Sequence, residues 1–222
     1  MNDLRQMMIN GAVELGVSLN EIAVDRLFVY KNFLKDYNEK VNLTSIVDDE
    51  GIIVKHFLDS LTVLPEMDIS QKVKVIDIGT GAGFPGMVLK IAQENVDLVL
   101  VDSTRKKLRF LEEVAERLGL DCVKCIHARA EELIRQKPDF KEGFDYVVSR
   151  AVARLPKLVE YCLPYVKPGG MFIAMKGRNY MEELEESRAI VKKLGGEIVN
   201  VKEIALPGSD IAHCLIKIRK NL

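Results

Sequence analysis

A run of glycines that follows an aspartate is the part of this sequence that most clearly indicates a site for chemistry. Residues 75–86 read Val-Ile-Asp-Ile-Gly-Thr-Gly-Ala-Gly-Phe-Pro-Gly. The apolar, β-branched start is typical of a buried strand, and the glycines predict a tight turn into a helix. Because glycine has no Cβ, a ligand can press against the backbone there. A strand, glycine turn and helix in this order predict the nucleotide-end pocket of a doubly wound α/β fold.

The spacing of the glycines favours one kind of cofactor over another. Residues 81–86 match the dinucleotide pattern G-x-G-x-x-G, but in that pattern the first glycine directly follows the strand. Here Gly79 follows the strand, and counting from it gives G-x-G-x-G with Gly81 and Gly83. This pattern, preceded by Asp77, is typical of enzymes that use S-adenosylmethionine. The Asp77 carboxylate suits a cationic ligand and would repel a pyrophosphate; its alternative role is to cap the loop.

Two later positions are expected to contact a nucleoside. Asp102 ends the second predicted strand, and the two oxygens of its carboxylate suit the two ribose hydroxyls. Ala130 and Glu131 open a helix after the third predicted strand, where a backbone N–H and a side-chain oxygen can contact an adenine edge. The alternatives are a cap of the following helix for Asp102 and a first-turn acid favoured by the helix dipole for Glu131.

The residues after the fourth predicted strand indicate what accepts the transferred group. That strand ends in Ser149-Arg150-Ala151, without the Asn/Asp-Pro-Pro-aromatic turn of amino-group methyltransferases and without the cysteine nucleophile of pyrimidine C5 enzymes. Guanine N7 needs neither, because it already carries an in-plane lone pair and no proton. Catalysis would then be mostly alignment for in-line attack. Arg150 is the candidate positioning residue, donating to guanine O6 or holding a phosphate.

Cations gather near the predicted carboxyl ends of the strands, although the whole chain has a formal net charge of -1. Their placement favours a phosphate-rich substrate. The RNA-binding candidates are Arg105, Lys106, Arg129, Arg154, Lys176 and Arg178. Four aromatic residues are candidates for stacking on bases or, equally, for core packing: Tyr30, Tyr37, Phe84 and Tyr180.

The cysteines, the length of the apolar runs and the N-terminal residues exclude several classes of protein. The four cysteines are too scattered for a disulfide framework, and Cys122-x-x-Cys125 lies in a predicted strand, where its side chains face opposite sides. We therefore expect no metal. No apolar run is long enough to span a membrane, and the N-terminal residues carry both charge signs. These features predict a cytoplasmic protein without a membrane partner, and we expect a monomer.

The order of elements predicts the architecture that positions these residues. Residues 1–66 read as a helical extension packed on the core, with Ser18-Leu19-Asn20-Glu21 at capping-box spacing and Ile22, Leu27 and Val29 on one apolar face. Residues 67–222 alternate strands and helices until the last two strands, 198–204 and 211–218, which have only Leu206-Pro207-Gly208-Ser209 between them. This predicts a doubly wound, seven-stranded methyltransferase sheet, Rossmann-like, with its last strand antiparallel.

Nearly end to end, the sequence resembles the bacterial small-subunit rRNA guanine-N7 methyltransferase family, historically called glucose-inhibited division protein B. The motifs that carry the resemblance are 37–44 (YNEKVNLT), 56–61 (HFLDSL), 77–86 (DIGTGAGFPG), 149–151 (SRA) and 176–177 (KG). One departure is Ala212-His213, where many members have Arg-His at the start of the last strand.

The resemblance implies methyl transfer from S-adenosylmethionine to N7 of a guanine in 16S rRNA, in the decoding-region loop. The implied partner is 16S rRNA or the 30S subunit. The implied cofactor contacts are Gly79, Phe84, Ala130, Glu131 and Arg150, with Asp102 near the ribose. Three alternatives stay open: a methyltransferase acting on another substrate, a non-catalytic RNA-binding protein of ribosome assembly, and a nicotinamide-dependent reductase, which the glycine spacing disfavours.

Overall fold

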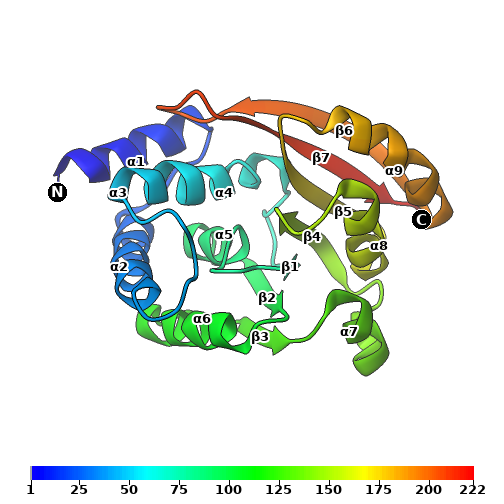
Figure 1. The fold of residues 1–222 in the computed structure, drawn as a ribbon, viewed down its shortest axis with the longest axis horizontal. Coiled ribbons are helices and arrows are strands. Elements are labelled where there is room, and N and C mark those ends of the chain that lie inside the picture. The colour runs from blue at the N-terminus through cyan, green and yellow to red at the C-terminus, as the bar shows by residue number, and fades with distance from the viewer. Residues whose placement is uncertain (1) are drawn as a thin grey trace.

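One seven-stranded sheet runs through the centre of the molecule (Figure 1). The structure is a computed structural model that describes residues 2–222, so Met1, the first residue of the expected helical extension, lies outside the described residues. The strands are β1 (Val73–Ile78), β2 (Val96–Asp102), β3 (Val123–His127), β4 (Phe144–Arg150), β5 (Val166–Gly177), β6 (Gly196–Ala205) and β7 (Ala212–Lys220). Their order in the sheet is β3-β2-β1-β4-β5-β7-β6.

The pairing of these strands confirms the predicted sheet. β1 to β5 pair in parallel, whereas β7 pairs antiparallel with both β5 and β6. The parallel strands read as nearly continuous apolar runs because helices cover both of their faces. Only a short turn joins β6 to β7, which leaves no length for a crossover helix and forces a hairpin. β5 begins at Val166 and, at 12 residues, is the longest of the seven strands.

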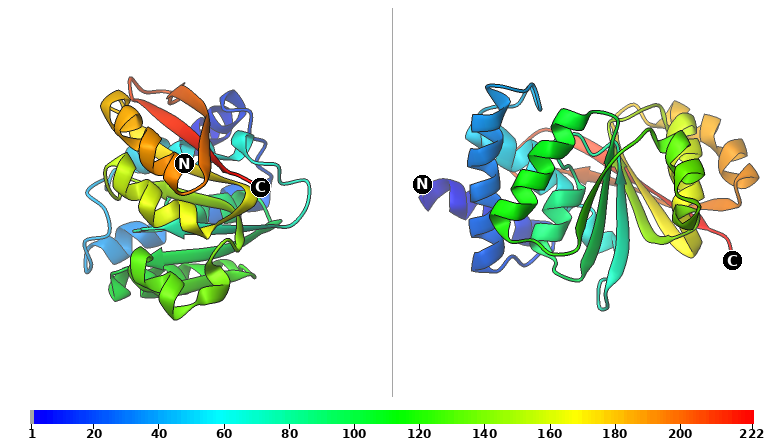
Figure 2. Two further views of the ribbon diagram at one scale, coloured as in Figure 1. Left: turned by 90° about the vertical axis from the view of Figure 1, so that its right-hand side faces the viewer. Right: turned by 90° about the horizontal axis from the view of Figure 1, so that it is seen from below.

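Helices cover the sheet on both faces (Figure 2). The helices are α1 (Asn2–Glu14), α2 (Glu21–Asn38), α3 (Asp49–Ile52), α4 (Asp59–Leu61), α5 (Gly86–Ala92), α6 (Arg105–Leu118), α7 (Ala130–Gln136), α8 (Leu155–Cys162) and α9 (Met181–Lys193). A π-helical segment, Ile53–Leu58, joins α3 to α4. α5 and α6 lie on one face together with the N-terminal helices, and α7, α8 and α9 lie on the other (Figure 2). No helix among residues 2–222 is long and apolar enough to cross a membrane.

The N-terminal helices form an additional layer outside α5 and α6. α2 contacts both of these helices, and α1 contacts the π-helical segment. The face of α2 that is buried differs from the predicted one, since Ile22 and Val29 are 60% and 43% exposed while Val24, Leu27 and Tyr30 are buried. The predicted capping residue was also wrong. Asn20 rather than Ser18 caps α2, because the Asn20 side chain accepts a hydrogen bond from the backbone N–H of Ala23 at 2.8 Å.

Two apolar clusters fill the space between the sheet and its covering helices. The first lies on the α5–α6 face and includes side chains of the N-terminal helices, such as Leu27 and Phe57, beside Val75 of β1. The second lies on the opposite face, between the strands and α7 to α9, and includes Val147 and Tyr165. Because the first cluster is shared, the N-terminal helices and the sheet bury each other's apolar surface.

Candidate functional site

Asp77 holds the glycine turn between β1 and α5 through hydrogen bonds of its side chain. The Asp77 side chain is fully buried, and its Oδ2 accepts hydrogen bonds from Thr80 Oγ1 at 2.7 Å and from the Gly86 N–H at 2.8 Å. Burial raises the pKa of Asp77 to about 6 although these hydrogen bonds oppose the shift, and Oδ1 has no hydrogen-bond partner within residues 2–222. The structure thus places Asp77 under the turn, where it fixes the backbone that a ligand meets.

The four glycines of the motif are required for different reasons. Gly79, Gly81 and Gly83 all have positive φ, at 72°, 60° and 98°. A side chain at Gly81 would point into open space, whereas one at Gly83 would approach the Tyr30 hydroxyl to 2.5 Å and Leu111 to 2.7 Å. A Cβ at Gly86 would lie 2.8 Å from the Asp77 carboxylate. Gly81 therefore leaves room for a ligand, whereas Gly83 and Gly86 leave room for neighbouring protein groups.

A cavity of about 240 Å³ opens at the carboxyl ends of β1, β2 and β3. The residues that line it are Ile78, Gly79, Val101, Asp102, Ser103, Ala128, Arg129, Ala130, Glu131, Val152 and Tyr161. The structure thus brings together Gly79, Asp102, Ala130 and Glu131, which sequence analysis had placed at one site. Parallel strands end at the same edge of the sheet, which is why residues distant in sequence meet there.

The chemistry of this cavity fits a nucleoside-type cofactor such as S-adenosylmethionine. Asp102 Oδ2 accepts the Gly81 N–H at 3.0 Å and Oδ1 accepts the Thr104 N–H at 2.8 Å. These bonds hold the carboxylate in place and leave each oxygen a second lone pair for a hydroxyl. Val101 and Ala128 supply buried apolar surface for a base. An apolar cleft with a few fixed polar groups is the usual form of a cofactor site.

Arg150 lies at the end of β4 and is held by the N-terminal helices. Its Nη1 donates to Asp59 Oδ2 at 2.5 Å and to the Lys55 carbonyl at 2.9 Å, and its Nη2 lies 3.1 Å from His56 Nδ1. Its guanidinium carbon lies 5.1 Å from the centre of the Phe84 ring. These contacts use three of the five guanidinium N–H donors, which leaves two for a ligand.

Asp59 joins Arg150 to the last strand of the sheet. The second oxygen of its carboxylate lies 2.7 Å from Nδ1 of His213 in β7. Burial raises the pKa of the Asp59 carboxyl, but the contact with His213 and the charge of Arg150 outweigh this effect and hold the pKa below its usual value. A second cavity, of about 200 Å³, is lined by Asp59, Arg150, Ala151, Met175, Lys176, Gly177 and His213.

His56 and its neighbours were not predicted as site residues. The His56 ring stacks on Phe84 with 4.3 Å between the ring centres, and His56 Nε2 lies 2.8 Å from Thr44 Oγ1. Burial and the charge of Arg150 lower the pKa of His56 to about 4, so the ring is neutral at pH 7. Asn38 holds the preceding loop by accepting the N–H groups of Leu43 and Thr44. The only sequence signal for this arrangement was the occurrence of these residues in motifs 37–44 and 56–61.

The six predicted RNA-binding cations fall into two groups. Arg105, Lys106 and Arg129 are exposed and make no ion pair among residues 2–222. The others already have partners: Arg154 pairs with Glu186 at 2.8 Å, Lys176 pairs with Glu183 at 2.7 Å, and Arg178 donates to the Asp210 carbonyl.

The aromatic candidates for base stacking are mostly core residues. Tyr30 and Phe84 are buried and pack against each other with ring centres 5.7 Å apart. Tyr180 is buried and donates to Glu203 Oε1 at 2.8 Å. Tyr37 is half-buried and packs on Phe110. All four residues thus contribute to packing.

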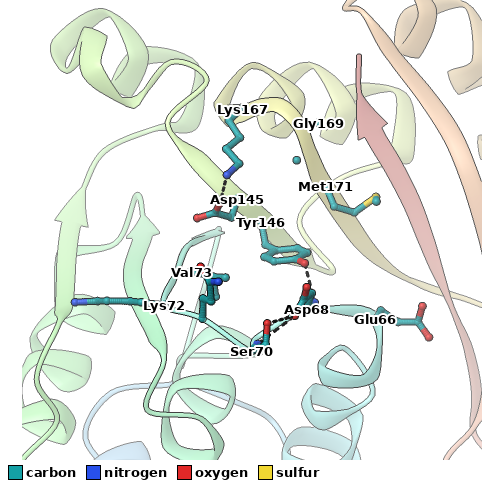
Figure 3. A pocket seen from close by; sticks show the side chains of 12 residues that line it. Glu66, Asp68, Ser70, Lys72, Val73, Asp145, Tyr146, Lys167, Gly169 and Met171 are labelled. Atoms are coloured by element: carbon teal, nitrogen blue, oxygen red, sulfur yellow. Dashed lines mark hydrogen bonds and ion pairs between the residues drawn. The ribbon is translucent and has the colours of Figure 1, made fainter. Parts of the chain in front are cut away.

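A larger cavity, of about 430 Å³, lies at the opposite edge of the sheet (Figure 3). Its charged groups have protein partners: Figure 3 shows Lys167 with Asp145 and Asp68 with Ser70, and Glu66 pairs with Lys202 and Lys217 outside the cavity. Tyr146 accepts the Asp68 N–H there at 2.8 Å. The carboxyl edge, where Asp102 in one cavity and Arg150 in the other have hydrogen-bonding groups available for a ligand, is the stronger candidate for chemistry.

The buried carboxyl of Asp77 predicts a specific pH dependence of stability. Its pKa is about 6 in the folded protein against 3.8 for the free side chain, so the folded state binds this proton more tightly. The resulting stabilisation is complete below about pH 4 and is lost as the pH rises through about 6. Relative to Asp77→Asn, the wild type should lose about 2 kcal/mol of unfolding free energy from pH 4 to pH 7. Urea denaturation of both proteins across this range measures the difference; a pH-independent difference would contradict the assignment.

The Asp59–Arg150 pair predicts a second effect on stability. Asp59→Asn leaves the partly buried Arg150 charge without this charged partner and should cost about 1.5–3 kcal/mol. Asp25→Asn is the matched control, because Asp25 also pairs with an arginine in the N-terminal region, Arg5, but its side chain is 64% exposed. The control should cost no more than about 1 kcal/mol. Urea denaturation distinguishes the two, and equal losses would show that Asp59 is an ordinary surface partner.

Comparisons with known proteins identify the family. The GidB family model, described as rRNA small subunit methyltransferase G, matches residues 24–211. A protein of Acetivibrio thermocellus named Ribosomal RNA small subunit methyltransferase G is 49% identical over 98% of this chain and 88% of its own length. A protein of the same name from Alkaliphilus oremlandii is 45% identical over 98% of this chain and 91% of its own length.

Solved structures agree in fold. TYW2 of M. jannaschii, solved in complex with AdoMet, superposes with a TM-score of 0.55 at 15% identity, over 69% of this chain and 72% of that one. The match confirms the predicted methyltransferase fold. With a family model that spans most of its length and relatives at 45% and 49% identity, the chain belongs to the GidB family, rRNA small subunit methyltransferase G.

Proposed function

We propose that this protein transfers a methyl group from S-adenosylmethionine to N7 of a guanine in 16S rRNA, in the decoding-region loop of the small ribosomal subunit. The membership of a family of small-subunit rRNA methyltransferases supports the reaction class and the substrate. The observation that carries the choice of atom is the set of groups at the end of β4. Arg150 stands there beside neutral His56 and the engaged carboxylate of Asp59, and guanine N7 needs no base to free its lone pair.

The cofactor residues have distinct proposed roles. When bound, S-adenosylmethionine supplies a methyl group on a positively charged sulfur, which an in-line lone pair attacks. Asp102 accepts the ribose hydroxyls, and Ala130 with Glu131 borders the adenine. The turn at Gly79 and Gly81 gives the methionine part close access to the backbone, Asp77 supports that turn, and Phe84 packs beneath Arg150.

Arg150 is the proposed positioning residue for the reaction. Its two N–H donors without a protein partner are suited to two ligand groups: the carboxylate of the cofactor and the O6 or phosphate of the guanine nucleotide. The guanidinium is held by Asp59, His56 and the Lys55 carbonyl before any ligand binds. Preorganised donors of this kind align a substrate without the cost of ordering a flexible side chain.

The RNA is proposed to run over the unpaired cations. Arg105 and Lys106 begin α6, and Arg129 directly precedes α7, so all three follow strands that end at the cofactor cavity. Phosphate contacts require cations that can exchange their counterions for the nucleic acid, which a side chain already held in an ion pair does less readily. We further propose that residues 1–66 act as a helical extension of a 67–222 core, and that the protein works as a monomer in the cytoplasm.

The first test of this function identifies product and position together. Wild-type protein incubated with labelled S-adenosylmethionine and either naked 16S rRNA or 30S particles should methylate one guanine in the decoding region. Borohydride–aniline cleavage at N7-methylguanine, read by primer extension, locates it. Gly81→Asp is the inactive control, because its side chain would enter the space beside Asp102. Labelled RNA that borohydride–aniline treatment does not cleave would mean that the methyl group is on an atom other than guanine N7. If neither naked 16S rRNA nor 30S particles were labelled, the proposed substrate would be rejected.

The second test separates the two groups of cations. Arg105→Ala combined with Lys106→Ala should weaken RNA binding at least about tenfold and lower the slope of log K against log salt by about 2. Arg154→Ala combined with Arg178→Ala removes the same formal charge from partnered residues and should change that slope by less than half as much. Filter binding at several salt concentrations gives both quantities; equal slopes would contradict the proposed RNA path.

A further inference from the structure

Two buried tyrosines hold the walls of the cofactor cavity from opposite faces of the sheet. Tyr30 of α2 donates its hydroxyl to the carbonyl of Ala82, in the glycine turn. Tyr165, just before β5, donates its hydroxyl to the carbonyl of Ala130, which lines the cavity. Tyr30 belongs to the apolar cluster on the α5–α6 face, and Tyr165 to the cluster on the α7–α9 face. The residues of the mechanism proposed above include neither.

Tyr30 is fitted closely to the glycine turn. Its ring is fully buried between Phe57 and Phe84, with ring centres 5.6 and 5.7 Å away. Its hydroxyl occupies the space that a side chain at Gly83 would need. Because burial raises the pKa of Tyr30, the hydroxyl keeps its proton and acts as a donor. Holding the Ala82 carbonyl also orients the peptide bond between Ala82 and Gly83. The N–H of this peptide bond donates to the Thr80 carbonyl at 2.9 Å and so closes the turn.

Tyr165 acts on the other wall in the same way. Its ring is fully buried, and its hydroxyl is bound to the first residue of α7. A trans peptide directs its C=O and N–H in opposite directions. Anchoring the Ala130 carbonyl therefore fixes the direction of the Glu131 N–H, next to the apolar surface where the base is proposed to bind.

We propose that Tyr30 and Tyr165 are positioning residues for S-adenosylmethionine: Tyr30 holds the glycine turn that follows Gly79, and Tyr165 holds Ala130 in the lining of the cavity. The inference rests on the proposed cofactor site. It adds that affinity for the cofactor depends on two hydroxyls outside the lining of the cavity, one of them supplied by the N-terminal helices. Cofactor binding and docking of the N-terminal helices are then linked, because the same α2 contact serves both.

Three single Tyr→Phe variants test this, each removing one oxygen atom. Tyr30→Phe and Tyr165→Phe should each raise the dissociation constant for S-adenosylmethionine about fivefold in calorimetry, the loss expected for one hydrogen bond. Tyr146→Phe is the matched control, because its hydroxyl also bonds one backbone group but lies at the opposite edge of the sheet (Figure 3). Its dissociation constant should match that of the wild type, while its melting temperature falls as much as that of the other two.

A second measurement uses the ligand-free proteins. Amide exchange at Gly83 should be faster in Tyr30→Phe. Exchange at Leu133, whose N–H donates to the Arg129 carbonyl in the first turn of α7, should be faster in Tyr165→Phe, and each should be unaffected by the other substitution. The inference is overturned if Tyr30→Phe and Tyr165→Phe both bind S-adenosylmethionine with wild-type affinity, or if Tyr146→Phe loses as much affinity as they do. Neither result affects the proposed function. Failure of the wild type itself to bind S-adenosylmethionine counts instead against the proposed function, and the exchange data still decide whether the tyrosines hold the two walls.

Discussion

The ion pair between the buried Asp59 and the partly buried Arg150 is the contact on which the arrangement of the site depends. A charge removed from water must keep its partner, so neither residue can move without the other. Asp59 begins α4, and Arg150 ends β4, 91 positions later. His213 of β7 contacts the same carboxylate. One buried acid thereby fixes the N-terminal helices, the acceptor side of the sheet and the last strand relative to one another.

The glycine turn shows how a ligand site and a packing interface share one short segment. Gly79 lines the cofactor cavity and Gly81 has open space beside it, whereas Gly83 receives the hydroxyl of Tyr30. Asp77 ties both ends of the turn together from beneath, at the cost of burying a carboxyl whose pKa rises to about 6. Protein groups thus hold the turn at Gly83 and Gly86 and leave open space at Gly81.

The charges of the molecule follow a similar division of roles. The chain is nearly neutral, and many of its cations are used in ion pairs that hold neighbouring elements together, as Lys176 does with Glu183. Unpaired cations remain at the starts of α6 and α7, beside the cofactor cavity. A phosphate-rich substrate would meet a local positive surface there without any excess of positive charge in the chain as a whole.

The sequence by itself determined the seven strands, the antiparallel β7, the S-adenosylmethionine-type glycine spacing and the grouping of Asp102 with Ala130 and Glu131. These follow from local patterns and from the rule that parallel strands end at one edge. Only the tertiary structure decided that Asp77 supports the turn, that Arg150 is held by Asp59 and His56, and that three of six cations are already paired. Those contacts join segments tens of residues apart, as Tyr30 and Ala82 are by 52 positions, so they depend on how helices dock rather than on any spacing along the chain.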